Sequence, residues 1–438
     1  MSGSKYTVAM TGATGLLGRN LLFELIRRHR QKLDELEIIV LGRGEGPGTS
    51  LWPRLRRILI SDGFSYMSVP VEERRELLAQ LAGVIRCVDL DLGDGDAVVR
   101  AGQLEKFRGH SIDCFFHLAG VTDFRSTPEA ACTLQRVNVE GTRRVLESVS
   151  RLGVGEFCYV STAYVCGDAE GRIYPSVLNE AARFRNAYER SKFEAELMVR
   201  SFGTRTGTRI RIFRPSTICG RLQEHPLGAT CKFDVFYAWA AFFLRLKQKL
   251  AAEPGAAEPG RLDVRICYST SSGLNIVPVD YAARVMCAVC EQNDPGESYH
   301  LVNDAETPHA WYIAEMLRTV GVTGVRHVQE IPETPNRQER LYYKSVGAFY
   351  TPYITCPEMR FDTASVEMVQ TREGLQCPSI GPREFAVLMA YAREQNFGLR
   401  ENLHAGIPCS PPKIPALAAR NMASGSLIRQ ARALSNPF

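Results

Sequence analysis

The stretch Tyr6 to Arg28, YTVAMTGATGLLGRNLLFELIRR, decides the fold, because a short apolar strand runs directly into a glycine-rich turn and then a helix. Thr7 to Met10 have the composition of a buried parallel strand. Gly12 allows a tight turn, Gly15 lets the backbone approach a pyrophosphate, and Gly18 lets the helix pack closely on the strand. Since the free N–H groups of a helix start attract anions, the stretch predicts a bound nucleotide. Three glycines at this spacing also occur in ordinary strand-to-helix turns, so the prediction needs support from further along the chain.

Length and composition are those of a globular protein. The 438 residues are 45% hydrophobic and 23% charged, enough for one large or two moderate domains. The net charge of +5 is spread over 53 basic and 48 acidic residues. Without a polybasic tract, we expect no nucleic-acid partner. The longest apolar run, Val235 to Leu244, is about half the roughly 20 residues that span a bilayer. This run is too short, so we expect no transmembrane segment. The first strand begins almost at the N-terminus, so we also expect no signal peptide and a cytoplasmic location.

Thirteen cysteines are present, an odd number, and many of them lie in strand-like apolar words such as Phe157-Cys158-Tyr159. This distribution favours buried, reduced thiols over disulfides. Cys287 and Cys290 form a CxxC pair within a helical pattern, with no second Cys or His pair beside it. We therefore expect core packing there and no metal site.

Strand and helix patterns alternate along the first 305 residues, which predicts an α/β fold built on a doubly wound parallel Rossmann sheet. The expected strands after the first are Glu37–Leu41, Val84–Leu90, Ser111–Ala119, Phe157–Val160, Ile210–Phe213 and Tyr299–Asn303. A smaller, mixed substrate-binding region is expected to follow. We expect residues 1–220, completed by 264–304, to bind the dinucleotide, residues 221–263 and 305–402 to bind substrate, and residues 403–438 to form a tail.

Arg43 follows the second expected strand, where an NAD site usually has an acidic residue for the ribose 2′-hydroxyl. An arginine suits a 2′-phosphate instead, so the sequence predicts NADPH. Arg19 at the start of the first helix could supplement this charge. The alternative is that Arg43 only solvates a turn.

Tyr188 and Lys192 form a YxxxK pair at the start of an expected helix. Residues four apart share a helix face, so the phenol and the ammonium group can point into one cavity. Ser161 and Thr162 follow the fifth strand, at the sheet edge where ligands of open α/β sheets bind. YxxxK alone is frequent by chance, and its weight comes from the other motifs.

Five words in one order, TGATGLLG, HLAG at 117–120, NVEGT at 138–142, STAYVCG at 161–167 and YERSK at 188–192, resemble the extended short-chain dehydrogenase/reductase family over roughly residues 5 to 305. The resemblance implies catalysis by Thr162, Tyr188 and Lys192. Together with the arguments above it implies a cofactor site made by Thr11, Gly12, Thr14, Gly15, Leu16, Leu17, Gly18, Arg19, Arg43, Asp91, Leu92, Leu118, Ala119, Gly120, Asn138, Tyr188, Lys192, Pro215, Ser216 and Thr217.

The resemblance also assigns parts to several of these residues. An Asp-Leu pair contacts adenine in the family, and Asp91-Leu92 fits better than Asp89-Leu90 because the next helix then begins at Val98. Asn138 braces the active site or a proton-relay water. Pro215 to Thr217 lie along the nicotinamide, whereas His117 is expected to be structural.

Within the family, three features are similar to fatty acyl-CoA reductases and to thioester reductase domains. They are Val40–Arg43 followed by Leu51–Leu55, the Ser161-Thr162 pair, and Phe349–Tyr353 with Arg360–Asp362. In contrast to the multidomain relatives we expect no adenylation or carrier segment, so an acyl thioester would have to come from outside. The oligomeric state stays open, although relatives commonly dimerise through the helices after strands four and five.

The implied reaction is hydride transfer from the nicotinamide to a carbonyl carbon, in which Tyr188 donates a proton to the oxygen. Thr162 hydrogen-bonds that oxygen, and Lys192 lowers the pKa of Tyr188 while holding the ribose. The aromatic segment Phe233 to Lys247 is expected to cap the nicotinamide, with Phe233, Phe236, Tyr237 and Phe243 along an apolar channel. Alternatives are a sugar-nucleotide epimerase or dehydratase, a hydroxysteroid-type dehydrogenase, and a non-catalytic NADP-binding scaffold.

Overall fold

A computed structural model describes residues 5–46, 49–93, 111–253 and 260–399 of the chain. The described residues belong to one compact unit. The expected tail at 403–438 and the helix start at Val98 lie outside the described residues. The division into a dinucleotide-binding and a substrate-binding region stays a prediction.

The centre of the molecule is a seven-stranded sheet in which every neighbouring pair is parallel. Its strand order is β12-β7-β5-β4-β1-β2-β3. The strands are β1 Tyr6–Thr11, β2 Leu36–Gly42, β3 Ile85–Asp89, β4 Ser111–His117, β5 Gly153–Val160, β7 Arg209–Pro215 and β12 Ser298–Leu301. The order reverses between β1 and β4, which opens a crevice at the carboxyl ends of these strands. The predicted doubly wound fold is confirmed.

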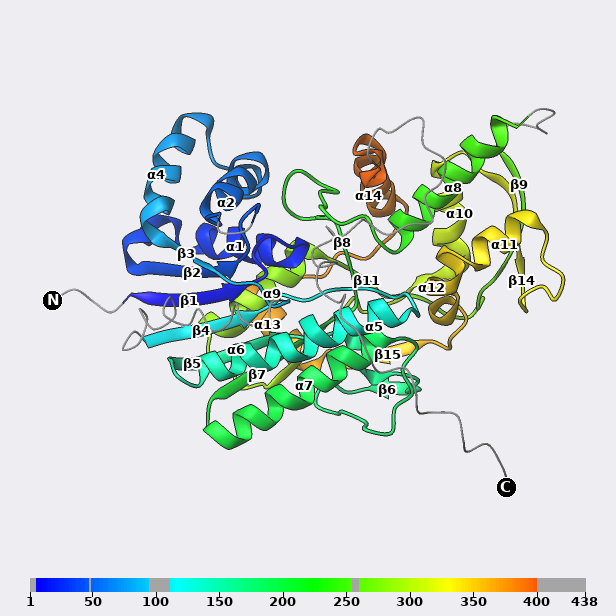
Figure 1. Ribbon diagram of the computed structural model, residues 1–438. Helices are drawn as coiled ribbons and strands as arrows, with labels where there is room; N and C mark the ends of the chain where they lie inside the picture. The colour runs from blue at the N-terminus through cyan, green and yellow to red at the C-terminus, as the bar shows by residue number, and fades with distance from the viewer. Residues whose placement is uncertain (1–4, 47–48, 94–110, 254–259, 400–438) are drawn as a thin grey trace, which may run out of the picture. The chain divides into compact units, whose positions relative to one another are not determined.

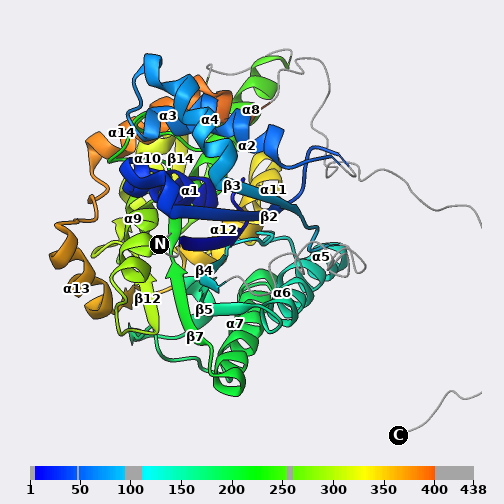
Figure 2. The ribbon, with the colours of Figure 1, turned by 90° about the vertical axis from the view of Figure 1, so that its left-hand side faces the viewer.

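Helices cover both faces of this sheet (Figures 1 and 2). In Figure 2, α9 and α13 lie on one side of the strands and α5, α6 and α7 on the other. The helices on the first side, together with those beyond β2, are α1 Leu16–His29, α2 Trp52–Ile58, α3 Phe64–Tyr66, α4 Arg74–Val84, α9 Val279–Glu291 and α13 Ala364–Glu373. Those on the second side are α5 Pro128–Leu134, α6 Gly141–Val149 and α7 Ala187–Thr206.

Alternation along β1 explains why the sheet needs both layers. Val8 and Met10 belong to the hydrophobic core shared with α1 and α9, whereas Ala9 belongs to the core shared with α6 and α7. Successive side chains of a strand point to opposite faces, so an apolar run such as β1 is buried only between two helical layers.

A third hydrophobic core lies in the region that follows β7. It is built by α8 Phe236–Ala251, α10 His309–Thr319, α11 Arg337–Tyr343, α12 Val346–Ile354 and α14 Pro382–Glu394, with strand β9 Arg261–Cys267 paired to β14 Thr323–Val328. Two-stranded pairs complete the fold: β8 Thr217–Cys219 with β11 Ile276–Pro278, β10 Gly273–Leu274 with β13 Thr307–Pro308, and β6 Gly171–Ile173 with β15 Met359–Phe361.

The aromatic residues of α8 form the interior of this core. Phe236 and Tyr237 are 1% exposed and Phe243 is 0% exposed, and all three pack with the apolar side chains of the neighbouring helices. Phe233, which precedes the helix, is half-buried against the same core. None of the four predicted residues lines the cavity that contains Tyr188, so the prediction that they border a substrate channel there is wrong. The segment is helical as expected, from Phe236 to Ala251, but an apolar helix face fits a core as well as a channel.

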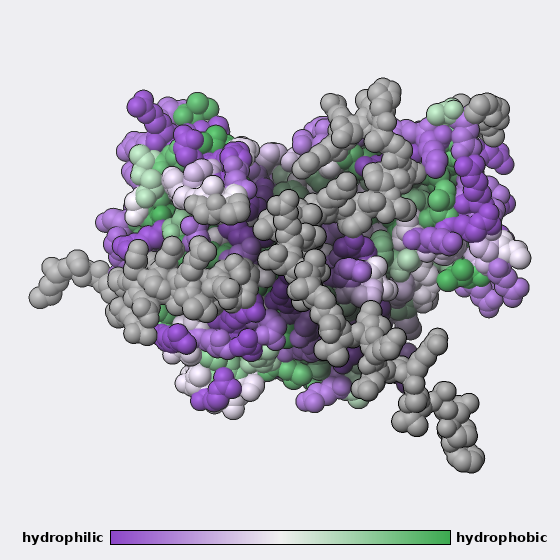
Figure 3. Space-filling view, in the orientation of Figure 1, coloured by the Kyte–Doolittle hydropathy of each residue, from purple (hydrophilic) through white to green (hydrophobic). Residues whose placement is uncertain are grey.

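No helix of the described ranges is long and apolar enough to cross a membrane. On the face drawn in Figure 3, hydrophilic side chains predominate at the upper right, where β9 and β14 lie.

Candidate active site

The glycine turn between β1 and α1 has the geometry that its sequence predicts. Gly12 has φ +76°, and a Cβ atom there would lie 2.7 Å from the Ala119 nitrogen. A Cβ atom on Gly18 would overlap the Gly12 carbonyl oxygen. Only glycine fits the first position in both space and conformation, and only glycine lets α1 approach the turn at the second.

The start of α1 is open to an anion. Gly15 is its N-cap residue and provides no side-chain cap, and the first turn contains no acidic residue. The Gly15 nitrogen donates to the Gly12 carbonyl oxygen at 2.9 Å, which closes the turn. The helix N–H groups that follow have no carboxylate competing for them, as a pyrophosphate site requires.

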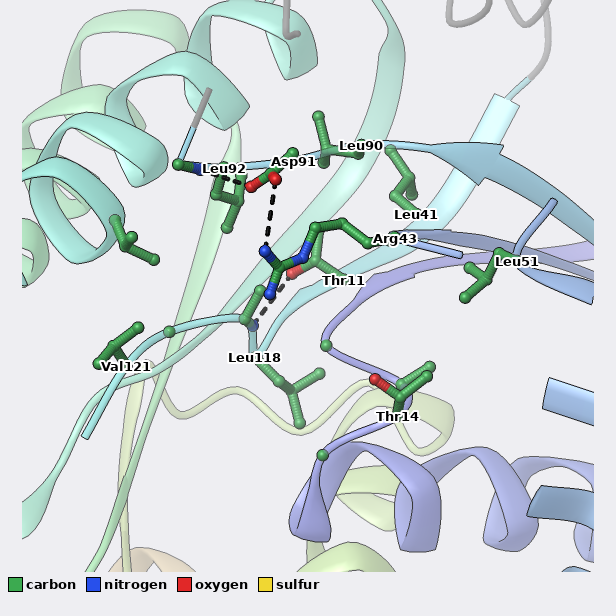
Figure 4. Close-up of a pocket in the computed structure, with 18 of the residues that line it drawn as sticks. Thr11, Thr14, Leu41, Arg43, Leu51, Leu90, Asp91, Leu92, Leu118 and Val121 are labelled. Carbon is green, nitrogen blue, oxygen red and sulfur yellow. Dashed lines mark hydrogen bonds and ion pairs between the residues drawn. The ribbon is translucent and has the colours of Figure 1, made fainter. Parts of the chain in front are cut away.

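A first cavity of about 550 Å³ lies beside this turn at the carboxyl ends of β1, β2 and β4. The Arg43 guanidinium and the Asp91 carboxylate face each other in it, Nη1 to Oδ2, at 3.3 Å (Figure 4). Arg54 and Arg136 also line the cavity. Three guanidinium groups against one carboxylate make this end of the site positively charged.

The two overlapping Asp-Leu pairs differ in how they meet the cavity wall, and the assignment of an adenine contact to Asp91-Leu92 stays a prediction. Leu90, Asp91 and Leu92 line the cavity, whereas Asp89 is the last residue of β3 and does not. The Gly93 nitrogen donates to Asp91 Oδ1 at 2.9 Å, which fixes the carboxylate at the end of the strand. The choice of Asp91-Leu92 agrees with this geometry.

A second cavity of about 350 Å³ continues from the first. Both cavities are lined by Gly12, Gly15, Leu118, Gly120 and Val121. The second is also lined by residues from the start of α1, the segment after β4, β5 and the loop after it, α7, the end of β7 with β8, and the loop before α8. They are Leu16, Leu17, Gly18, Thr122, Phe124, Val160, Ser161, Thr162, Tyr164, Tyr188, Lys192, Pro215, Ser216, Thr217, Ile218, Lys232, Asp234 and Val235. Because they share the five residues named first, the two cavities form one cleft along the glycine turn.

Tyr188 and Lys192 reach the second cavity because α7 begins just before them. Asn186 caps the helix, its Oδ1 accepting from the Glu189 nitrogen at 3.0 Å. The half-buried Tyr188 ring packs edge-on against Phe124, with the ring centroids 5.4 Å apart. Burial raises the pKa of Tyr188 above its ordinary value, so the phenol stays protonated at neutral pH. The expectation that Lys192 lowers this pKa is wrong for the free protein, because the positive charge that partly offsets the rise is that of Lys232.

Lys192 is held in place by residues of β5. Its Nζ donates to the Val160 carbonyl oxygen at 2.6 Å and lies 4.3 Å from the centre of the Tyr159 ring. Burial lowers its pKa to about 7, while the Glu196 carboxylate one turn further along α7 opposes that shift. The Lys192 ammonium is thus a buried hydrogen-bond donor at the end of β5, where Val160 lines the second cavity.

Thr162 lies at the end of β5 and is 4% exposed. Its hydroxyl makes a long hydrogen bond to the Pro215 carbonyl oxygen, 3.4 Å, and accepts an equally long one from the Tyr164 nitrogen. Such long contacts are weak, so the hydroxyl can turn towards a substrate oxygen.

Asn138 supports the site from behind without lining either cavity. It lies in the π-helical turn Gln135–Glu140 between α5 and α6. Its Oδ1 accepts from the Val121 nitrogen at 2.8 Å, and its Nδ2 donates to the Val121 carbonyl oxygen at 2.9 Å and to Ser191 Oγ at 3.0 Å. Asn138 therefore ties the cavity wall at Val121 to the helix of Tyr188.

His117 joins two strands and a helix behind the cofactor cleft. Its Nδ1 lies 2.7 Å from Thr11 Oγ1 and its Nε2 lies 3.0 Å from Thr142 Oγ1. Thr142 donates to the Asn138 carbonyl oxygen at 2.6 Å, so it accepts from His117, which places the proton on Nε2. Burial, with a smaller effect from Lys192, lowers the pKa of His117 to about 3. The expected structural part of His117 fits this network.

Every residue predicted to bind the cofactor lines one of the two cavities, except Asn138 and Arg19. Arg19 Nη2 donates to the Thr14 carbonyl oxygen at 2.9 Å, and Nη1 lies 3.6 Å from Asp62. Its guanidinium is thus held by the Thr14 carbonyl and Asp62 and lines neither cavity.

The sequence-based site omitted four charged residues that line the cleft. Arg54 and Arg136 lie in the first cavity, and Lys232 and Asp234 in the second, where their side chains pair at 2.8 Å. Arg54 follows the second strand closely and could have been found from its proximity to Arg43. Lys232 and Asp234 lie in an irregular loop, where no periodic pattern distinguishes them.

A glycine-turn cleft with a Thr, a Tyr and a Lys at its inner end defines a nicotinamide-dependent oxidoreductase of the extended short-chain dehydrogenase/reductase type. More particularly, the chain belongs to the male sterility and fatty acyl-CoA reductase family, because the family model described as "Male sterility protein" matches residues 10–286.

Three curated relatives are similar in sequence. Glycine betaine reductase ATRR of Emericella nidulans is 25% identical over 72% of the chain, human fatty acyl-CoA reductase 2 is 28% identical over 36%, and GDP-6-deoxy-D-mannose reductase of Pseudomonas aeruginosa is 32% identical over 35%. The alignments span 22%, 28% and 47% of the relatives, so the chain matches less than half the length of each.

One solved structure has the same fold over nearly its whole length. The terminal R domain from the myxalamid PKS-NRPS biosynthetic pathway superposes with a TM-score of 0.66 at 22% identity, covering 91% of this chain and 93% of that one.

Proposed function

We propose that this protein is an NADPH-dependent reductase that transfers hydride to the carbonyl of an apolar acyl thioester or aldehyde, giving an aldehyde or an alcohol. The main support is that Thr162, Tyr188 and Lys192 line one cavity that is continuous with the glycine turn. A carbonyl carbon in that cavity would lie between the nicotinamide position and the Tyr188 phenol.

Each of these three side chains has a separate part in the proposed reaction. Tyr188 donates its proton to the oxygen as hydride reaches the carbon, and its raised pKa keeps the proton available. Thr162 donates a hydrogen bond to the same oxygen. Lys192, when protonated, holds the ribose hydroxyls and stabilises negative charge on the phenol oxygen.

The choice of NADPH is supported by the charge of the first cavity. Arg43, Arg54 and Arg136 contribute three positive charges to it, and Asp91 contributes one negative charge. A 2′-phosphate adds about two negative charges, and guanidinium groups bind phosphate in a bidentate manner. NADH has the same pyrophosphate but a hydroxyl in place of the 2′-phosphate, so it would bring about two fewer negative charges to this cavity.

The choice of an acyl substrate rests on family and relatives. One relative is named a fatty acyl-CoA reductase, and the R domain with the same fold belongs to a biosynthetic assembly pathway. In this proposal the acyl group arrives on coenzyme A or on a separate carrier. One hydride and one proton convert the thioester to a hemithioacetal, whose C–S bond then breaks to release the carrier thiol and leave the aldehyde. A second hydride and a second proton, from a second NADPH, reduce the aldehyde to an alcohol.

A reductase of polar substrates, such as nucleotide sugars, is the second candidate. The Lys232–Asp234 pair lines the cavity beside Tyr188, and the aromatic residues of α8 do not. A charged pair at this place suits a polar substrate better than an alkyl chain. The 32% identical relative is named a GDP-6-deoxy-D-mannose reductase.

The deciding experiment follows NADPH oxidation by the full chain with a panel of acyl-CoAs, carrier-bound acyl thioesters, aldehydes and nucleotide sugars, together with product analysis. We expect turnover of thioesters or apolar aldehydes, and a loss of about 100- to 10,000-fold in Tyr188→Phe with unchanged NADPH binding. Turnover of nucleotide sugars alone would establish the second candidate. NADPH binding without turnover of any compound would indicate a scaffold.

A further inference from the structure

Three cysteines and a glutamate meet inside the fold, away from the two cavities. Cys114 on β4, Glu156 and Cys158 on β5 and Cys290 on α9 have their Sγ and carboxylate oxygen atoms within 4.8 Å of one another. Cys114, Glu156 and Cys158 are buried and Cys290 is half-buried. None of the four lines the cofactor cleft.

The spacing within this cluster is close to that of a tetrahedral metal site. Cys158 Sγ lies 3.4 Å from both Cys114 Sγ and Cys290 Sγ, and Glu156 Oε1 lies 3.6 Å from Cys158 Sγ and 3.9 Å from Cys114 Sγ. Four ligands at about 2.0 to 2.3 Å from a zinc ion are separated by about 3.5 to 3.8 Å along the edges of the tetrahedron. The sulfur atoms are too far apart for a disulfide, whose bond length is about 2.05 Å.

The surroundings of the cluster supply the charge that such a site needs. Glu156 Oε2 accepts from Arg211 Nε at 2.6 Å and lies 3.7 Å from Arg209 Nε, which leaves Oε1 directed at the thiols. Three thiolates, one carboxylate and a Zn²⁺ ion have two net negative charges. The two guanidinium groups balance them, so the metal-bound cluster would be neutral inside the protein.

We propose that Cys114, Glu156, Cys158 and Cys290 form a structural zinc site that fastens α9 to the central sheet. Four protein ligands leave no open position, which is typical of structural and not of catalytic zinc. Thiolates prefer zinc to the harder Mg²⁺ and Ca²⁺ ions. Half-buried Cys290 offers a route for the ion from solvent. The proposal is independent of the proposed reductase activity.

The proposed zinc site could not be predicted from the spacing of cysteines along the sequence. Cys287 and Cys290 form the CxxC pair, but Cys287 is not part of the cluster. The partners of Cys290 come instead from two adjacent strands, where Cys114 pairs with Glu156 in the parallel register and Cys158 lies two residues beyond. Only the packing of α9 on the sheet brings the four ligands together.

The test begins with the metal content of the full chain, purified without a metal-affinity tag from zinc-supplemented medium. We expect about one zinc per chain, the stoichiometry of a single closed site. Protein stripped of metal and treated with Co²⁺ should show the absorption of thiolate-to-cobalt charge transfer and of tetrahedral Co²⁺. Less than one-tenth of an equivalent of zinc together with no such absorption would overturn the proposal and leave the cysteines as packing thiols.

Variants then locate the ion. Cys158→Ser and Cys290→Ser should lose the zinc and the cobalt spectrum, whereas Cys287→Ser, on the same helix and also buried, should keep both. Cofactor binding is measured in each variant to show that it is folded. A folded Cys158→Ser or Cys290→Ser variant that keeps full zinc content would overturn the assignment, and so would loss of zinc from folded Cys287→Ser.

Discussion

The Arg43 guanidinium and the Asp91 carboxylate form an ion pair across the mouth of the first cavity, with Nη1 3.3 Å from Oδ2. The Arg43 side chain is 69% exposed and that of Asp91 is 37% exposed. Exposed pairs of this kind contribute about 0–1 kcal/mol, so Arg43 can exchange Asp91 for a stronger partner at little cost. A cofactor phosphate is such a partner.

Replacing Arg43 with Asp should weaken NADPH binding by about 1–3 kcal/mol, roughly 5- to 150-fold, because a charge-assisted contact to phosphate is lost. NADH binding should change much less. Arg57→Asp is the matched control, since Arg57 lies on the following helix, is 64% exposed and does not line the cavity. Fluorescence titration with both cofactors measures the effect. Equal losses for NADPH and NADH in Arg43→Asp would contradict the assignment.

Gly18→Ala should destabilise the protein and weaken cofactor binding. The new Cβ would overlap the Gly12 carbonyl, and forcing α1 away from the turn costs about 1–3 kcal/mol. Gly83→Ala is the control, because Gly83 lies in α4 with nothing within 4 Å of its added Cβ. That change should stabilise the protein by up to about 1 kcal/mol through helix propensity. Thermal unfolding of both variants measures the contrast, and equal melting temperatures would contradict it.

The His117 network should make the fold sensitive to acid. The folded-state pKa of His117 is about 3, below the ordinary 6.5, so the unfolded chain binds the proton first and stability falls as pH drops from 6.5 towards 3. His117→Gln should cost about 1–3 kcal/mol at pH 7, since a buried partner of Thr11 or Thr142 is lost. The difference in the free energy of unfolding between the variant and the wild type should become smaller at acid pH. Urea unfolding of both proteins at neutral and acid pH measures this difference. A difference that stays the same at both pH values would refute the prediction.

The pH dependence of cofactor capture should report Lys192. Burial lowers its pKa to about 7 in the free protein, and in the proposed mechanism the charged ammonium binds the cofactor ribose more strongly than the neutral amine, so kcat/KM for NADPH should decline as pH rises through 7. In Lys192→Arg the side chain stays charged, so the decline of kcat/KM above pH 7 should disappear, even though kcat/KM itself is lower than in the wild type. A profile for the wild type that is flat on both sides of pH 7 would contradict the prediction.

Most of the expected cofactor site, from the glycine turn to Tyr188 and Lys192, could be predicted from the sequence. Its residues are determined by steric limits on the backbone and by short spacings along the chain. Gly12 and Gly18 occupy positions that no other residue can fill, and Tyr188 and Lys192 are one helical turn apart. Such relations stay within a few residues of the chain, where local geometry determines them.

The substrate end could not be predicted in the same way. The aromatic run of α8 fits a core and a channel equally, and only its packing against α10, α11 and α14 decides for the core. Lys232 and Asp234 reach the cavity from an irregular loop before α8. Their position depends on how that loop returns across the sheet edge, which no periodicity encodes.

The packing of α9 on α1 imposes an order on biosynthesis. Arg28 of α1 pairs with Glu291 of α9, 263 residues later, and β12 joins the sheet beside β7 only when residues 298–301 exist. During translation at about 5–20 residues per second, the apolar side of α1 and the edge of β7 therefore remain uncovered for many seconds after they emerge. A nascent chain of this protein is exposed to aggregation during that interval, and chaperones that shield apolar helices and unpaired strands would act on it then.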